Sequence, residues 1–354
     1  MRVKMADIAK EADVSLSLVS RLLRDDPTLK VTQATRERVM KAKRRLGGYQ
    51  PRATKQNKAG HVIVPINRIF AEAYCARYVV GSPLWTELER GLHRAGCRLS
   101  VAFFDEANRM ETLREWMNSP QSISGLFLLT GLVDQAMADI LHERRFPHVC
   151  VDRQVQALNV NTVCADEETA VRLSMEHLFA LGCKEIVYLG LRGNYYRYFM
   201  GMMAEAGLPS GDNLFCETPW PAETVETPID WRKAAAQALT QWLETHPAPE
   251  ALYCRNDDMA LGAIDALRQR DIRPGRDIDI IGYDNIEQQP GSQIKRPMLT
   301  TVEHPYAEIG RHCAYRLIEQ MNHREQRSVF HEYLPVHLIV RKSTRPLGDR
   351  ADSK

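Results

Sequence analysis

The most restrictive feature of this sequence is a regular alternation of short apolar runs and longer amphipathic segments between residues 61 and 281. The apolar runs have the length of buried strands, and the amphipathic segments repeat their apolar positions at helical spacing. Such alternation is typical of parallel sheets covered by helices on both faces. The segment is too long for one ordinary doubly wound domain, so we predict two α/β lobes.

The expected elements can be placed along the chain from this pattern alone. Predicted strands are His61–Ile66, Arg98–Phe103, Gly125–Leu129, Pro147–Val151, Glu185–Leu189, Ala251–Cys254 and Asp279–Ile281. Predicted helices are Leu84–Ala95, Arg109–Met117, Val133–Arg144, Glu167–Leu181, Ile229–Glu244 and Asp258–Arg270. Lobes of this kind bind small molecules at the carboxyl ends of their strands, in the cleft between them.

The first fifty residues have a different pattern, with three short amphipathic helices and no strand. A helix over residues 6–12 is followed by Asp13, which tolerates the left-handed conformation of a tight turn, and by Ser15, a good N-cap. A second helix covers residues 16–23, and Thr32 caps a third helix that ends before two glycines. Two helices joined by a three-residue turn and followed by a basic helix predict a helix-turn-helix domain.

Charge is distributed unevenly between this head and the body. Residues 1–60 contain 15 Lys and Arg against 6 Asp and Glu, whereas the remainder contains 32 against 39. A basic head on an acidic body favours a module that binds a polyanion such as DNA. A solvated basic surface is the alternative interpretation.

The second helix of a helix-turn-helix domain enters the major groove with its N-terminal residues at the base edges. In this chain the residues predicted to contact DNA from that helix are Leu16, Ser17, Ser20 and Arg21. Arg21 can read guanine because its fork matches O6 and N7; a phosphate contact or a surface ion pair is the alternative. Leu16 can cover a thymine methyl group or pack in the core.

Several head segments resemble the N-terminal signature of the LacI/GalR family of transcriptional regulators in order and spacing. They are Asp7-Ile-Ala, Ala12-Asp-Val-Ser15, Val19-Ser-Arg21, Thr35-Arg36 and Tyr49-Gln-Pro51. The chain departs from the family at Asp13, where Gly is usual, and in a longer loop over residues 25–31. The resemblance implies a DNA-binding domain over residues 1–50.

The resemblance also implies a hinge over residues 51–60, which in the family folds as a short helix on DNA and inserts a Leu into the minor groove. Lys58 stands about where that Leu belongs. We therefore predict basic contacts from Arg52, Lys55 and Lys58, and no apolar wedge. A plain flexible linker is the alternative.

The body resembles the effector domain of the same family in five segments: His177–Ile186, Cys254–Gly262, Asp279–Asn285, Pro297–Val302 and Leu338–Thr344. The resemblance implies a two-lobe, periplasmic-binding-protein-like unit over residues 61–345 with parallel sheets. We assign about 61–163 and 292–325 to the N-lobe, about 164–291 and 326–345 to the C-lobe, and 346–354 to a tail.

The resemblance places effector-binding residues on this chain one at a time. Asn256 matches an Asn that hydrogen-bonds a sugar hydroxyl, Asp284 matches the ligand-binding carboxylate of the C-lobe, and Asp152 matches an acidic residue at the lobe boundary. Trp231 matches an aromatic residue that stacks on the ligand. The alternatives are helix capping for Asn256, turn capping for Asp284 and Asp152, and core packing for Trp231.

The family's effector-binding Arg is the least regular match. It usually precedes a Gly by three positions, whereas here Arg197 precedes Gly201 by four and Tyr198 occupies the usual place. We choose Arg197 for this role, with Arg192 as the alternative, and the neighbouring Tyr195, Tyr196 and Tyr198 can supply stacking surface.

Other functional classes lack their signatures. No apolar run is long enough to span a bilayer, and charges near Met1 argue against a signal peptide, so we predict a cytoplasmic protein with no membrane partner. The eight cysteines show neither C-x-x-C spacing nor an accompanying His cluster, so we predict no metal site and no cofactor. Enzyme motifs are also missing, so we predict no enzyme.

The sequence therefore predicts a homodimeric, operator-binding repressor controlled by a small-molecule effector, a sugar or a sugar derivative. The tail after Arg341 has no apolar heptads that would join dimers into tetramers. Activation, or a corepressor outside the sugar class such as a purine, stays open. A sugar-binding receptor and an enzyme that uses the same cleft are the remaining alternatives.

Overall fold

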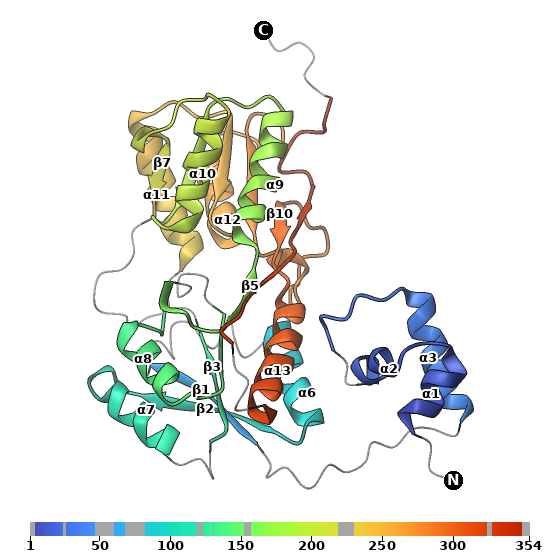
Figure 1. Cartoon of the computed structure of the whole chain (residues 1–354). Helices are drawn as coiled ribbons and strands as arrows, with labels where there is room; N and C mark the ends of the chain where they lie inside the picture. Colours follow the sequence, from blue (N-terminus) through green and yellow to red (C-terminus); the bar gives the residue numbers. More distant parts are fainter. Residues whose placement is uncertain are drawn as a thin grey trace.

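A computed structural model of the chain describes residues 4–23, 26–46, 60–67, 82–118, 123–129, 131–151, 157–218, 230–323 and 328–348. Figure 1 shows a three-helix head beside a body of two stacked lobes. Within the described ranges, no helix combines the length and the apolar character needed to cross a membrane.

The head consists of α1 (Met5–Ala12), α2 (Leu16–Leu23) and α3 (Gln33–Arg45). Asp13 has the predicted left-handed backbone, with φ of 50° and ψ of 57°. The side chain of Ser15 accepts a hydrogen bond from the backbone N–H of Leu18 at 3.1 Å, and Thr32 caps α3 in the same way. The three helices close over a small core of Ile8, Ala9, Ala12, Val19, Leu22, Val39 and Ala42.

The first lobe is built on a six-stranded parallel sheet in the order β11-β5-β4-β3-β1-β2. Its strands are β1 (His61–Asn67), β2 (Arg98–Phe104), β3 (Gly125–Leu128), β4 (His148–Cys150), β5 (Thr162–Ala165) and β11 (His331–Leu334). Its helices are α6 (Pro83–Arg94), α7 (Arg109–Asn118), α8 (Gln135–Glu143), α13 (Tyr306–Asn322) and the 3-10 turn η2 (Glu106–Asn108).

The second lobe repeats this topology in the order β12-β10-β9-β8-β6-β7, with β12 antiparallel to β10. Its strands are β6 (Ile186–Gly190), β7 (Phe215–Glu217), β8 (Ala251–Cys254), β9 (Asp279–Tyr283), β10 (Thr300–Glu303) and β12 (His337–Ile339). Its helices are α9 (Glu167–Ala180), α10 (Asn194–Glu205), α11 (Trp231–Thr245), α12 (Asp257–Arg268) and the 3-10 turns η4 (Asp212–Leu214) and η5 (Ile286–Gln288).

One glycine in each lobe permits close helix packing. A Cβ built on Gly262 of α12 would lie 2.1 Å from the carbonyl oxygen of Arg232 in α11. A Cβ built on Gly310 of α13 would lie 2.2 Å from the carbonyl oxygen of Leu84 in α6. Both helix pairs therefore depend on the absence of a side chain where they approach most closely.

The predicted fold class is confirmed, but two segments were assigned to the wrong lobe. β10 lies in the range 292–325 that we gave to the N-lobe, yet it pairs with β9 of the second sheet. β11 lies in the range 326–345 that we gave to the C-lobe, yet it pairs with β5 of the first sheet. Hydrophobic periodicity predicts that a strand exists, but it does not say which neighbour it pairs with.

The connections between lobes fix which ends of the two sheets face each other. β5 of the first sheet is followed almost at once by α9 of the second lobe. β10 of the second sheet is followed almost at once by α13, which packs on α6 of the first lobe. The carboxyl ends of both sheets therefore face the boundary between the lobes (Figure 1).

Candidate DNA-binding helix and effector site

The start of α2 presents the side chains that the sequence predicts to contact DNA. Leu16 is 53% exposed and Ser17 is also exposed, while Ser20 is half-buried. The structure therefore does not support core packing for Leu16. An apolar side chain left in solvent at the first position of a recognition helix is available to a base edge.

Arg21 is held by the loop that follows α2. Its Nε lies 2.6 Å from Oδ2 of Asp26, and one terminal nitrogen donates to the hydroxyl of Thr28 at 3.0 Å. Burial alone would raise the pKa of Asp26, but hydrogen bonds from Thr28 and Arg21 lower it. In the free protein Arg21 therefore forms an ion pair, as in the alternative interpretation of the sequence. Its side chain is still partly exposed.

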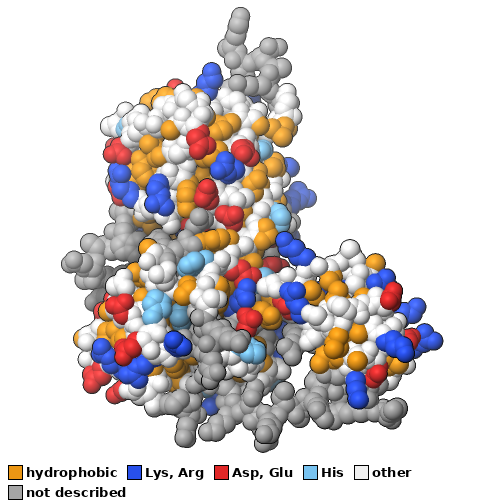
Figure 2. Space-filling view, viewed as in Figure 1, with side chains coloured by type: hydrophobic (Ala, Val, Ile, Leu, Met, Phe, Trp, Pro, Cys, Tyr) orange, Lys and Arg blue, Asp and Glu red, His pale blue; other side chains and the backbone are white. Residues whose placement is uncertain are grey.

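The third helix supplies the basic surface of the head. Arg38, Lys41, Arg44 and Arg45 are exposed on α3, opposite the buried Val39 and Ala42. Figure 2 shows Lys and Arg side chains on the outer side of the head. Of the other predicted contacts, Arg52, Lys55 and Lys58 of the hinge lie outside the described residues, as does Asp152 of the body.

At the carboxyl end of the second sheet, a cation and several aromatic rings lie together. The guanidinium of Arg255, which follows β8, lies 3.8 Å from the ring centroid of Tyr195. Tyr195 contacts Tyr283 at 5.5 Å between centroids, and Tyr283 contacts His304 at 5.6 Å. His304 in turn lies 3.9 Å from the ring of Tyr306. These groups form a polar and aromatic surface beside the lobe boundary.

Asp284 adds an acidic group to this surface. Its Oδ1 accepts a hydrogen bond from the Tyr306 hydroxyl at 3.0 Å. Burial raises the pKa of Asp284 to about 7, although the charge of Arg255 and the Tyr306 hydrogen bond lower it. Its φ of 112° is uncommon for a residue with a side chain, and strained backbone of this kind is concentrated at functional sites.

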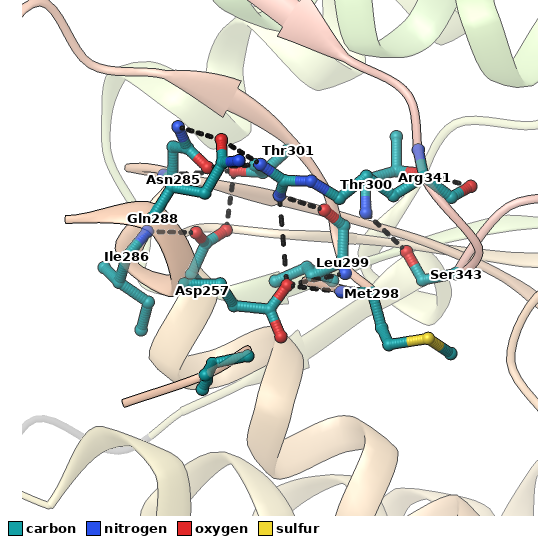
Figure 3. Close-up of polar contacts among 12 residues, drawn as sticks. Asp257, Asn285, Ile286, Gln288, Met298, Leu299, Thr300, Thr301, Arg341 and Ser343 are labelled. Carbon is teal, nitrogen blue, oxygen red and sulfur yellow. Dashed lines mark hydrogen bonds and ion pairs between the residues drawn. The ribbon is translucent and has the colours of Figure 1, made fainter. Parts of the chain in front are cut away.

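A buried network holds Asp284 in this conformation. The carboxylate of Asp257, the first residue of α12, accepts from the Thr301 hydroxyl at 2.7 Å and from the backbone N–H of Ile286 at 2.9 Å (Figure 3). Arg341 donates to the side-chain oxygen of Asn285 at 2.6 Å. The residues that follow Asp284 are thus tied to α12, β10 and the segment after β12. Burial raises the pKa of Asp257 well above its usual range.

The structure brings only part of the predicted effector set together. Asn256 caps α12, and its Oδ1 accepts from the backbone N–H of Met259 at 2.9 Å, which is the capping alternative. It still lies directly beside Arg255. Trp231 is 6% exposed and packs in the core on the α11 and α12 side of the sheet, which is the core alternative. Arg197 is exposed and donates to Asn194 at 3.0 Å.

Sequence reasoning missed Arg255, His304 and Tyr306. A signal for the first was present, because Arg255 directly precedes the Asn256-Asp257 pair that marked the end of a strand. Helical periodicity also separates Arg197 from the site. Tyr195, Phe199 and Met203 form the buried face of α10, so a residue two positions after Tyr195 points outward.

In the described part of the chain, no cluster of three His, Cys, Asp or Glu side chains is placed to hold a metal ion. The seven cysteines that the structure describes are free thiols, and six of them are buried. Burial raises the pKa of Cys183 and Cys216 to about 12, so neither is a reactive thiolate at neutral pH.

Comparison with known proteins agrees with this architecture. Residues 4–52 match the profile described as bacterial regulatory proteins, lacI family, and residues 175–344 match a periplasmic binding protein-like domain. The transcriptional repressor CytR of Escherichia coli strain K12 is 28% identical over 358 residues, covering 97% of this chain and 96% of that protein.

Solved structures show the same fold over nearly the whole chain. One is the lac repressor dimer bound to operator and an anti-inducer, with a TM-score of 0.63, 23% identity and coverage of 98% of this chain and 100% of that one. Another is the complex of the transcriptional regulator CelR with cellobiose, with a TM-score of 0.63, 21% identity and coverage of 97% and 100%. The head, the two-lobe body and these matches show that the chain belongs to the LacI family of DNA-binding transcriptional regulators.

Proposed function

We propose that the protein is a homodimeric repressor that leaves its operator, or binds it more tightly, in response to a sugar-like effector. One observation carries the proposal. A recognition helix with exposed Leu16 and Arg21 shares the chain with a separate polar and aromatic site around Arg255 and Asp284. A chain that holds both can transmit the binding of one ligand to the other.

The DNA contacts in this proposal come from α2 and the hinge. They are Leu16, Ser17, Ser20 and Arg21, together with Arg52, Lys55 and Lys58. A dimer presents two recognition helices to two half-sites about one or more helical turns apart, which supplies affinity that one head lacks. The solved lac repressor structure is described as a dimer on its operator, which supports this assembly for a chain of the same fold.

The effector contacts in this proposal come from both lobes. Asn256 and Asp284 offer hydrogen-bonding groups from the second lobe, and Asp152 is kept as a further contact because it matches an acidic effector residue of the family. Arg255 takes the cationic role that the sequence assigned to Arg197, and the partly exposed ring of Tyr306 in the first lobe takes the stacking role assigned to Trp231. The CelR structure is described as a cellobiose complex, which supports a carbohydrate as the effector of a chain with the same fold.

We further propose that the effector is bound and not converted, in a protein that acts in the cytoplasm beside its operator. The carboxylates of the site accept structural hydrogen bonds. Asp257 accepts from the Thr301 hydroxyl and the backbone N–H of Ile286, and Asp284 accepts from the Tyr306 hydroxyl. Incubation of purified protein with the bound sugar, followed by chromatography of the sugar, tests this point. Conversion of the sugar would contradict it.

The experiment that tests the function starts from a random duplex DNA library, because no operator is named by the sequence. Full-length protein should select a pseudo-palindrome, and light scattering should give a dimer at micromolar concentration. Operator affinity is then titrated with sugars, sugar acids, sugar phosphates and purines. A fall in affinity identifies an inducer, and a rise identifies a corepressor. Failure to enrich any sequence, or a tetramer, contradicts the corresponding part of the proposal.

A further inference from the structure

The side chain of Arg255 has no hydrogen-bonded or ion-paired partner among the described residues, although it lies partly buried at the carboxyl end of the second sheet. Its guanidinium instead packs over the ring of Tyr195 in a cation–π contact. By contrast, Arg232, Arg273 and Arg345 each contact a carboxylate within 3 Å. Within the described part of the chain, the side-chain N–H donors of Arg255 are thus unpaired at the lobe boundary.

The charge of Arg255 is maintained by its surroundings and is not cancelled by them. Burial alone would lower its pKa, but Tyr195, Tyr188 and the carboxylates of Glu167 and Asp284 raise it. These carboxylates act through the electrostatic field without touching the guanidinium. Asp284 gives one oxygen to the Tyr306 hydroxyl, and burial favours its neutral form near pH 7. Near pH 7 the site therefore holds the fully charged guanidinium of Arg255 beside the only partly ionised carboxyl group of Asp284.

Two other buried polar atoms near Arg255 lack a hydrogen-bond partner among the described residues. Nδ1 of His304 and the hydroxyl of Tyr253, a residue only 1% exposed, are buried without a hydrogen bond in the described part of the chain. Burial and then the charge of Arg255 lower the pKa of His304 to about 3, so its ring is neutral at physiological pH. A neutral imidazole can donate to or accept from a ligand hydroxyl.

These observations point to a ligand that brings its own negative charge. A guanidinium offers paired N–H donors whose fork matches the two oxygens of a carboxylate or a phosphate. The partly exposed ring of Tyr306 provides an apolar face for a sugar ring, and Asp284 and His304 provide groups for its hydroxyls. We propose that the effector is an acidic sugar derivative whose carboxylate or phosphate binds Arg255. This inference rests on the proposed effector site and specifies the ligand class.

The test uses matched sets that differ only in charge: glucose, glucuronate and glucose 6-phosphate; galactose, galacturonate and galactose 6-phosphate; and ribose with ribose 5-phosphate. Affinity for the full-length protein is measured by calorimetry. At least one acidic compound should bind at least 10-fold more tightly than its neutral counterpart. The uronates and the phosphates separate the two sources of charge. Equal or tighter binding of the neutral sugars, or no binding by any acidic member, overturns the inference.

Variants assign the effect to Arg255. Arg255→Gln should weaken the acidic compound about 10- to 100-fold, because a charged bidentate contact is lost, and should leave the neutral counterpart within about 3-fold. Arg255→Lys should restore only part of the affinity, because an ammonium lacks the fork. Arg197→Gln is the matched control on the exposed side of α10 and should bind like the wild type. Retention of acid preference in Arg255→Gln overturns the inference. If the Gln variant does not fold, full wild-type affinity of Arg255→Lys for the acidic compound overturns it instead.

The operator selected from the random library separates this inference from the proposed function. If the protein binds its operator and responds only to neutral sugars, the proposed function is supported and the inference about the acidic effector is contradicted. If the protein binds acidic sugars but enriches no DNA sequence, the proposed function is contradicted and the inferred ligand class is supported.

Discussion

Arg21 and Asp26 form an ion pair of 2.6 Å across the loop that ends α2, and Asp26 is almost completely buried in that loop. The ion pair restrains the orientation of the Arg21 guanidinium, because the Thr28 hydroxyl is hydrogen-bonded to both side chains. A recognition arginine held in this way loses less conformational entropy when it meets a base edge than a free one does.

Arg21→Ala should weaken operator binding by about 1 to 3 kcal/mol and relax the preference at one operator position. Arg21→Lys should not restore the preference fully, because an ammonium cannot contact O6 and N7 of guanine in the fork geometry. Repeating the library selection with each variant measures both effects. Equal weakening on all sequences would show that Arg21 contacts only phosphate.

Asp26→Asn should reduce the preference at the position read by Arg21 about 3- to 10-fold, because the guanidinium loses its charged anchor. In an Arg21→Ala background the same change should have no further effect there, as expected for a residue that acts through Arg21. Tyr315 of α13 also interacts with Asp26, so Tyr315→Phe is the matched control and should keep the wild-type preference. An effect of Asp26→Asn that persists without Arg21 would assign Asp26 to loop stability alone.

Gly262→Ala should lower the free energy of unfolding by about 1 to 3 kcal/mol, because its methyl group would meet the Arg232 carbonyl oxygen at 2.1 Å. Gly201 is the control, since a Cβ at that position of α10 has nothing within 4 Å. Gly201→Ala should be neutral or stabilise by up to about 1 kcal/mol, as Ala is the better helix former. Urea unfolding of both variants tests the close approach of α11 and α12, and equal effects at the two positions would contradict it.

These predictions depend on features that the sequence revealed to different degrees. The turn at Asp13 and the caps Ser15 and Thr32 were predictable, because their conformations are set by neighbours within three residues. The lobe membership of β10 and β11 was not, since it depends on pairing with strands far away in the sequence.

The effector site shows the same limit at the level of single side chains. Family resemblance predicted both Asp284 and Arg197 as effector contacts, but Arg197 lies on the outer face of α10, away from Asp284. The cation of the site comes from Arg255, whose direction follows from the register of β8 with β6 and β9. No local pattern encodes that register.

The raised pKa of Asp284 predicts how stability changes with pH. Its ordinary pKa of 3.8 is raised to about 7 in the folded protein, so between these values the folded state binds more protons than the unfolded state. The free energy of unfolding contributed by this group therefore falls as pH rises from about 4 to 7 and is constant above that range. Asp284→Asn removes the effect.

Urea unfolding of ligand-free wild type and Asp284→Asn at several pH values measures this difference. The variant should gain stability relative to the wild type as pH rises towards 8, by at most a few kcal/mol. Burial and the charge of Asp284 both raise the pKa of Asp257, so the substitution also reduces the Asp257 shift, and the difference reports on the two coupled carboxyl groups together. A difference that does not change between pH 4 and 8 would show that Asp284 keeps its ordinary pKa.

The last prediction concerns communication between the effector site and the operator. Asp284 is tied through Asn285 and Asp257 to β10, and β10 leads within three residues into α13 of the first lobe. A ligand that contacts Asp284 and Arg255 therefore acts on a connection between the lobes. If one lobe arrangement favours the DNA-bound heads, effector and operator must each change the affinity of the other by the same factor, typically about 5- to 150-fold.

Asp284→Ala should abolish the response of operator affinity to the most effective compound of the sugar panel, while operator binding without ligand stays within about 2-fold of the wild type. The reason is that the substitution removes a ligand contact at the lobe boundary and leaves α2 and its loop unchanged. Operator titrations with and without the compound give the coupling factor, and ligand titrations with and without operator must return the same value. A folded Asp284→Ala dimer that no longer binds operator would instead show that Asp284 supports the lobe arrangement itself.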